Sequence, residues 1–189
     1  MSLSRREALQ MSLCFAGTLS AQGFWSPAHS GPPNDSLKES VLKRDAEIAW
    51  RYFSASYPGA DRGLAPAATW PEGNGFGRYD ILTMWDAGSL ILANISARSI
   101  SLIDEKEFDQ RIKAVMVFLR RSEFRWGKLT LPNYRTANSG GRTVEPGYDA
   151  TDTGRLLIAL HILDQATNGA YKIKQQVARW NLADTVING

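Results

Sequence analysis

Five stretches of the chain carry apolar residues at helical spacing, and they differ in how much polar surface they keep. The stretches at about 36–56, 104–121 and 173–180 are apolar on one side only, which is typical of helices with one face in water. The stretches at about 86–98 and 152–163 are apolar nearly throughout, which predicts helices that are covered on every side. The alternation therefore predicts outer helices around inner ones.

The two inner stretches are copies of one motif. Trp85-Asp86-Ala87-Gly88-Ser89 resembles Thr151-Asp152-Thr153-Gly154-Arg155, at an offset of 152 − 86 = 66 residues. Self-similarity at a fixed spacing indicates a repeated supersecondary unit. If the two helices run parallel, the segments that precede them meet at one end of the fold.

Those preceding segments, at about 57–85 and 122–149, are rich in Gly, Pro and aromatic residues and have no helical pattern. Loops of this length in a compact domain are usually functional or disordered, and their aromatic content argues against disorder. We predict two long aromatic loops that build one cleft. The fold class that follows is all-α, a partial (α/α) toroid of alternating inner and outer helices. A five-helix bundle is the alternative, which the long loops disfavour.

The first thirty residues have the layout of an export signal. Arg5 and Arg6 precede an apolar stretch from Met11 to Ala21, followed by small and Pro-rich residues through Ser30. This layout predicts a cleaved leader at 1–30, and the paired arginines favour the twin-arginine route over general secretion. The stretch is too short for a stable membrane span. We expect a linker at 31–36, an incomplete toroid-like domain at 37–189, and a periplasmic or secreted protein.

The composition and charge of the chain limit the partners and cofactors it is expected to have. The formal net charge is +3, and the basic residues are scattered, which disfavours nucleic acid as a partner. The single cysteine, Cys14, lies in the leader, and His161 is the one histidine expected in the mature chain. No metal site and no cofactor are therefore predicted. We expect His161, inside an apolar helix, to be a buried histidine rather than a catalytic base.

Carboxylates near the predicted cleft are the candidates for catalysis. Hydrolysis of a glycosidic bond needs an acid and a base or nucleophile, and the repeat singles out Asp86 and Asp152, with Glu145 as a loop acid in the same cleft. Helix capping explains the two aspartates at least as well, because a carboxylate at a helix start accepts free backbone N–H bonds. Gly88 and Gly154 are expected to permit close approach of a neighbouring group.

Flat aromatic faces with polar neighbours suit pyranose rings. Trp85 and Trp126 have the alternative role of capping the core. The residues predicted to bind substrate are Trp70, Tyr79, Trp85, Trp126, Asn133, Tyr134, Tyr148 and Arg155.

Several motifs together resemble the bacterial domain-of-unknown-function 3131 family over residues 44–182. They are Thr83-Met84-Trp85-Asp86-Ala87-Gly88-Ser89, Glu107-Phe108-Asp109-Gln110-Arg111, Leu131-Pro132-Asn133-Tyr134, Asp152-Thr153-Gly154-Arg155-Leu156-Leu157-Ile158-Ala159-Leu160 and Arg179-Trp180. The resemblance implies a six-hairpin toroid akin to glycoamylase-like enzymes, of which this chain is the N-terminal half, so that a second chain would complete the toroid. One departure is Gly147-Tyr148-Asp149, where the family usually has a Gly-Trp-Ser-type stretch. The resemblance carries no established reaction.

The sequence thus predicts an exported carbohydrate-active protein, a glycoside hydrolase that acts on a bacterial glycan by acid/base carboxylate chemistry. A non-catalytic glycan-binding or assembly protein of the same fold and an inactive truncated fragment are the alternatives. The expected partner is a glycan or oligosaccharide.

Overall fold

The computed structural model describes residues 35–55, 61, 63–73 and 75–185. The chain falls into two units, Met1–Val41 and Leu42–Gly189, and the fold below is that of the second. The predicted leader at 1–30 and most of the linker lie outside the described residues. Within the described residues no helix is long and apolar enough to cross a membrane.

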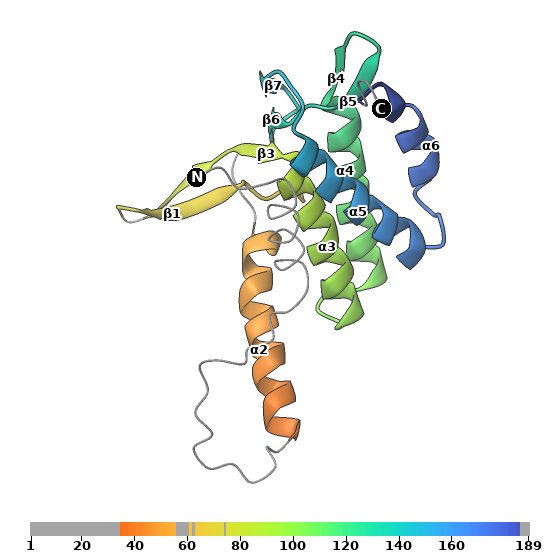
Figure 1. The fold of residues 1–189 in the computed structure, drawn as a ribbon. Coiled ribbons are helices and arrows are strands. Elements are labelled where there is room, and N and C mark those ends of the chain that lie inside the picture. The colour runs from red at the N-terminus through yellow and green to blue at the C-terminus, as the bar shows by residue number, and fades with distance from the viewer. Residues whose placement is uncertain (1–34, 56–60, 62, 74, 186–189) are drawn as a thin grey trace, which may run out of the picture. The chain divides into compact units, whose positions relative to one another are not determined.

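All five predicted helical stretches form helices, and a short 3-10 helix follows them (Figure 1). They are α2 (Asp35–Ser54), α3 (Met84–Ser99), α4 (Glu105–Arg121), α5 (Ala150–Ala166), α6 (Ile173–Ala178) and η1 (Leu182–Thr185). α2 begins inside the predicted linker, and both repeated helices begin two residues before their aspartate.

The prediction of an all-α fold is wrong, because both predicted loops contain strands. β1 (Ala68–Glu72) and β2 (Gly75–Tyr79) form one antiparallel hairpin, and β4 (Glu123–Trp126) and β5 (Leu129–Pro132) form another. A third sheet has the order β3–β6–β7, with β3 (Ile81–Thr83), β6 (Arg135–Ala137) and β7 (Thr143–Glu145). Because β3 comes from the first loop and β6 from the second, this sheet ties the two loops together. The described part is therefore mixed α/β, with small antiparallel sheets beside the helices.

α3 and α5 pack side by side and run parallel, as the repeat predicts (Figure 1). Near their starts the Arg155 Nε donates to the Ser89 hydroxyl at 3.2 Å, and at their far ends Arg98 donates to the carbonyl of Ala166 at 3.1 Å. Gly88 permits the close approach, because a Cβ there would lie 3.2 Å from the Arg155 carbonyl oxygen. The equivalent Gly154 has no such neighbour within 4 Å.

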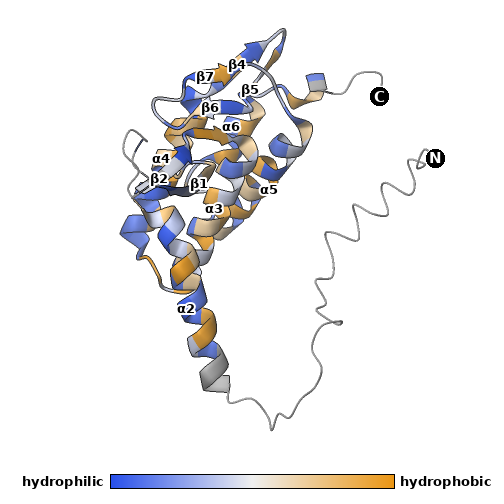
Figure 2. Ribbon diagram, turned by 90° about the vertical axis from the view of Figure 1, so that its left-hand side faces the viewer, coloured by the Kyte–Doolittle hydropathy of each residue, from blue (hydrophilic) through white to orange (hydrophobic). Residues whose placement is uncertain are grey.

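The apolar face of α4 completes the hydrophobic core. Phe108, Ile112 and Val115 are fully buried, and Trp180 covers the core from beyond α6. In Figure 2 α3 is mostly hydrophobic or intermediate in colour, whereas α2 alternates between hydrophobic and hydrophilic residues.

The prediction that both apolar helices are covered on every side is wrong for α5. Ile158 is 62% exposed and Ile162 is 39% exposed, and His161 between them is exposed rather than buried. Apolar composition shows that a side chain gains from burial, and it does not show that the chain supplies a partner. The inner layer expected of a toroid is therefore not formed around α5 in the described structure.

Candidate active site

The N-terminus of α3 is closed by a reciprocal capping box. The Thr83 hydroxyl oxygen accepts the backbone N–H of Asp86 at 3.2 Å, and the Asp86 carboxylate accepts the backbone N–H of Thr83 at 2.9 Å. The Thr83 hydroxyl also donates to the same carboxylate at 3.0 Å. Asp86 therefore has a capping role, as the alternative interpretation of the sequence expects.

The N-terminus of α5 is built differently, although the sequence repeats. Asp149 is the cap of this helix, and its carboxylate accepts the backbone N–H of Asp152 at 2.8 Å. The Asp152 carboxylate instead lies beside the N-terminus of α3, where the Thr83 side chain and the Trp85 backbone interact with it. The two repeated aspartates, one from each helix, thus meet at Thr83, and we call them the carboxylate pair.

The surroundings of Asp152 favour its protonated form. Burial raises the pKa of Asp152 above its ordinary value, and the negative charges of Asp149 and Asp86 raise it further. The hydrogen bonds from Thr83 and Trp85 act in the opposite direction without cancelling the shift. A carboxyl group with a raised pKa beside a second, hydrogen-bonded carboxyl group is the arrangement that acid/base hydrolysis needs.

An exposed aromatic ring adjoins the carboxylate pair. Trp85 lies in the first turn of α3 and is 43% exposed. The guanidinium carbon of Arg155 is 4.3 Å from the centre of its ring, a cation–π contact that covers one ring face and fixes the tryptophan. Because Arg155 also bonds to Ser89, the residue equivalent to it in the repeat, the ring and the guanidinium are held by both helices.

A cross-strand row leads from the carboxylate pair to Glu145. Thr83 pairs with Arg135, and Arg135 pairs with Glu145, so the three side chains lie on the same face of the β3–β6–β7 sheet. Arg135 contacts the Glu145 carboxylate at 2.5 Å and also donates to the Tyr79 hydroxyl. Hydrogen bonds from Tyr134 and Arg135 lower the pKa of Glu145, which keeps it an anion. Glu145 is therefore suited to orientation and ion pairing rather than to proton donation.

Asn133 is fully buried and holds the second loop in shape. Its amide nitrogen donates to the carbonyls of Arg135 and Glu145 at 2.7 and 2.9 Å, and its amide oxygen accepts the Gly147 N–H at 2.9 Å. All of these bonds are made to other residues of the protein, so the structural role of Asn133 is to position Glu145 and Tyr134.

Trp70 lies on the β1–β2 hairpin and is 46% exposed. Its indole covers Gly77, where a Cβ would lie 2.2 Å from the ring nitrogen. No described contact joins Trp70 to the carboxylate pair.

Trp126 and Tyr148 border a hollow of about 560 Å³ beside the β4–β5 hairpin, together with Lys128, Leu129 and Asp184. Trp126 is 62% exposed, and its ring meets Phe124 edge-on at 6.3 Å. The Tyr148 hydroxyl donates to the carbonyl of Phe124, which holds its ring against the hairpin. Tyr148, which borders this hollow, directly precedes Asp149, the cap of α5. The hollow and the carboxylate pair are therefore connected by the segment that leads into α5.

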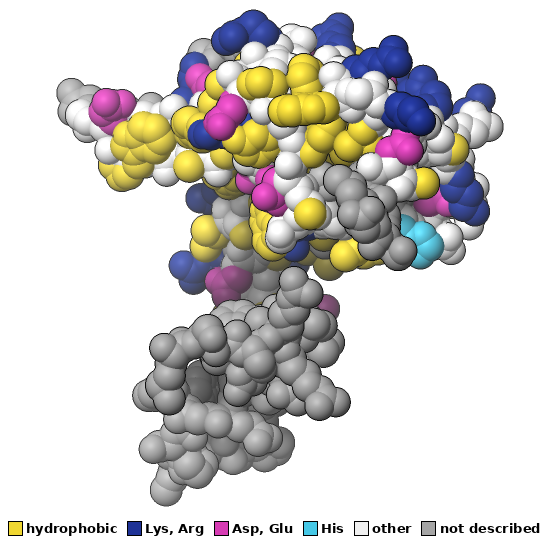
Figure 3. Space-filling model, turned by 45° about the horizontal axis from the view of Figure 1, so that its top comes forward, with side chains coloured by type: hydrophobic (Ala, Val, Ile, Leu, Met, Phe, Trp, Pro, Cys, Tyr) yellow, Lys and Arg dark blue, Asp and Glu magenta, His cyan; other side chains and the backbone are white. Residues whose placement is uncertain are grey.

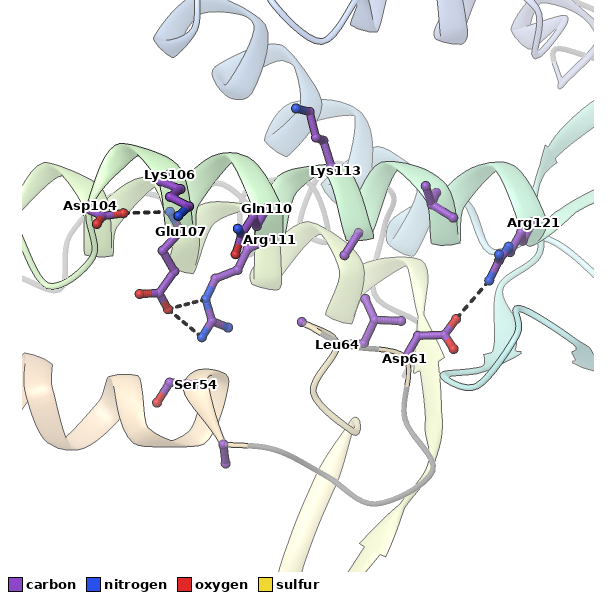
Figure 4. Close-up of a pocket in the computed structure, with 14 residues that line it drawn as sticks. Ser54, Asp61, Leu64, Asp104, Lys106, Glu107, Gln110, Arg111, Lys113 and Arg121 are labelled. Atoms are coloured by element: carbon purple, nitrogen blue, oxygen red, sulfur yellow. Dashed lines mark hydrogen bonds and ion pairs between the residues drawn. The ribbon is translucent and has the colours of Figure 1, made fainter.

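A larger hollow, of about 1210 Å³, lies between α4 and the end of α2 (Figure 4). Its most prominent charges are paired within the protein. Glu107 contacts Arg111 at 2.8 Å, and Asp61 contacts Arg121 at 3.4 Å. Arg111 also donates to the carbonyl of Phe53, so this arginine attaches α2 to α4. The large hollow contains none of the predicted site residues.

The structure therefore brings Trp85, Asp86, Asp152 and Arg155 together, aligns Glu145, Tyr79 and Tyr134 along the adjoining sheet, and leaves Trp70 apart. Figure 3 shows hydrophobic side chains gathered on this end of the molecule with acidic side chains among them. Thr83, which the sequence reasoning did not select, is the residue at which both carboxylates meet. The spacing Thr83-x-x-Asp86 is a capping-box pattern and could have identified it. Among the described residues no group of three or more His, Cys, Asp or Glu side chains could hold a metal ion.

Comparison with known proteins gives the family and no activity. No curated protein and no solved structure matches the chain. The family model described as "Protein of unknown function (DUF3131)" matches residues 44–189, which covers every described strand, all of α3 to α6 and most of α2. The match includes both copies of the Asp-x-Gly motif and the residues around Thr83. The chain belongs to the DUF3131 family.

Proposed function

We propose that the protein is a glycan-acting hydrolase in which the carboxylate pair performs the chemistry. The observation that carries the proposal is the meeting of Asp86 and Asp152 at Thr83 in unlike environments, beside the exposed ring of Trp85. Pairs of carboxyl groups whose surroundings separate their proton affinities are the usual means of acid/base catalysis on sugars.

Asp152 takes the role of the acid in this proposal. Its raised pKa favours donation of a proton to the glycosidic oxygen as the bond to the leaving sugar breaks. The Asp86 carboxylate, anchored by two bonds from Thr83, supplies the negative charge on the other side of the bond. Trp85 offers an aromatic edge and its free face to a pyranose ring, and Arg155 orients the sugar hydroxyls around it.

A panel of bacterial oligo- and polysaccharides tests the proposal, with release of reducing ends as the readout. Asp86→Asn and Asp152→Asn are compared with the wild type, and each keeps the shape of the side chain. Glu105→Gln, an exposed acid on α4, is the matched control. The proposal expects cleavage by the wild type and the control only, with similar melting temperatures in all four proteins. Equal cleavage by both aspartate variants, or no cleavage of any glycan by the wild type, contradicts it.

A glycan-binding protein without catalysis is the second candidate. The hollow between Trp126 and Tyr148 supports it, because a strongly exposed indole beside Lys128 and Asp184 offers both a stacking face and hydrogen-bond partners to a sugar. In that case Trp126→Ala weakens glycan binding, whereas Asp86→Asn and Asp152→Asn bind as the wild type does and no protein cleaves.

Export to the periplasm belongs to the same proposal, and Arg5 and Arg6 before the apolar stretch support it. Replacing both arginines by lysine keeps the charge and should retain the protein in the cytoplasm if the twin-arginine route is used. Unchanged export of this variant would indicate general secretion. A second chain as partner is also a proposal, and the exposed Ile158 and Ile162 of α5 support it.

A further inference from the structure

One face of α5 is apolar, exposed and without a partner among the described residues. Ile158 is 62% exposed and Ile162 is 39% exposed, which is unusual for a helix whose opposite side is packed. Thr151, His161 and Gln165 are exposed on the same side. We call the five residues Thr151, Gly154, Ile158, Ile162 and Gln165 the outer face of α5.

The repeat shows what kind of contact this face can make. Gly88 of α3 is in contact with the α5 backbone at Arg155 and Leu156, at 3.2–3.3 Å from a Cβ placed on it. Gly154 is its repeat equivalent, and a Cβ placed on it meets nothing within 4 Å. The outer face therefore has an open space at Gly154, which we call the notch, where a neighbouring group can pack closely.

The outer face is symmetric about Ile158. Gly154 and Ile162 lie four residues before and after it, and Thr151 and Gln165 lie seven residues before and after it. A two-fold axis through Ile158 therefore places Ile162 of one copy in the notch at Gly154 of the other, and Thr151 opposite Gln165. The isoleucine side chain of one copy fills the space at the glycine of the other, and a polar pair, threonine opposite glutamine, lies at each end.

Charge favours the same partner. None of the five residues of the outer face is acidic or basic, so these residues bring no like charges together across the axis, and His161 is the one exposed titratable side chain of α5 beside them. The nearest cation, Arg155, is directed toward Trp85 and Ser89. We propose that the outer face of α5 is a homodimer interface, in which two copies pack antiparallel α5 helices through Ile158. This interface is independent of the proposed hydrolase activity, since it contains neither aspartate of the carboxylate pair.

Sedimentation equilibrium of the full chain tests the proposal between about 1 µM and about 1 mM, the range in which a single helix-pair contact is expected to associate. The average mass should rise from 20.9 kDa toward twice that value. Ile158→Asp places two charges on the axis, and Gly154→Leu fills the notch in open space, so both should remain monomeric, with a helical spectrum like that of the monomeric wild type and a melting temperature that is not lowered. Ile100→Asp, at an isoleucine after α3 that is 48% exposed, is the matched control and should still dimerise.

A cross-link gives a second readout that does not depend on the folding of these variants. In a Cys14→Ser background the Ile158→Cys chain has one thiol, and the two-fold axis brings it against its own copy. Mild oxidation should give a covalent dimer, whereas Lys113→Cys on the exposed side of α4 should not. A wild type that stays monomeric at every concentration, dimers that persist in Ile158→Asp and Gly154→Leu, or equal cross-linking at both positions overturns the proposal.

Discussion

Replacing each repeated glycine by alanine should change stability in opposite directions. Gly88 and Gly154 are both the fifth residue of their helix, so the gain in helix propensity, about 1 kcal/mol, is the same for both variants. A Cβ at Gly154 meets nothing within 4 Å, and Gly154→Ala should therefore raise the free energy of unfolding by about that amount.

Gly88→Ala carries an added cost, because its Cβ would lie 3.2–3.3 Å from backbone atoms of Arg155 and Leu156. Backbone cannot rotate away as a side chain can, so α3 and α5 must separate, at about 1–3 kcal/mol for an overpacked contact. The difference between the two variants is therefore about 1–3 kcal/mol, with Gly88→Ala the less stable. Urea unfolding at concentrations where the chain is monomeric measures it. Two variants of equal stability, within about 0.5 kcal/mol, would refute the close parallel packing of α3 against α5.

Three further outcomes follow from the described contacts. Thr83→Val should lower the free energy of unfolding by about 1–2 kcal/mol by removing the cap of α3, and Thr83→Ser should retain most of it; an unaffected valine variant would contradict the capping box. Trp126→Ala should weaken oligosaccharide binding about tenfold without lowering the melting temperature, as judged by calorimetric titration, and unchanged binding would remove the hollow as a sugar site. Burial raises the pKa of Tyr171 to about 12, so the stability it contributes is fully present below pH 10 and is lost as the pH rises from 10 through 12; Tyr171→Phe should show a smaller fall of melting temperature over that window, and identical pH profiles would contradict this.

The helices could be predicted because their signal is local. Phe108, Ile112 and Val115 recur at helical spacing and are fully buried in α4, and the matched Asp-x-Gly motifs anticipated that α3 and α5 lie parallel. The strands could not be predicted in this way. β3 and β6 are three residues each, and Thr83 pairs with Arg135 more than fifty positions away, so neither strand shows its partner in its own sequence.

The residues of the candidate site could be predicted from the sequence, but the partners with which they interact could not. The repeat identified Asp86 and Asp152, yet identical motifs gave different contacts, because Asp149 caps α5 while Thr83 caps α3. That difference leaves Asp152 free to reach across to α3, which only the packing of the two helices decides. The exposure of Ile158 was likewise hidden, because an apolar helix looks the same in sequence whether or not a partner covers it.

The pH dependence of glycan cleavage tests the assignment of Asp152 as the acid most directly. Wild type and Thr83→Val are assayed on a cleaved glycan from the panel, with kcat/KM measured across the acidic and neutral range and folding checked at each pH. Because the acid must be protonated, activity should fall as the pH rises through the raised pKa of Asp152. The Thr83 hydrogen bond lowers this pKa, so its loss should move the fall to higher pH. A fall at the same pH in both proteins, or an Asp152→Asn variant that cleaves with the wild-type profile, would contradict the account.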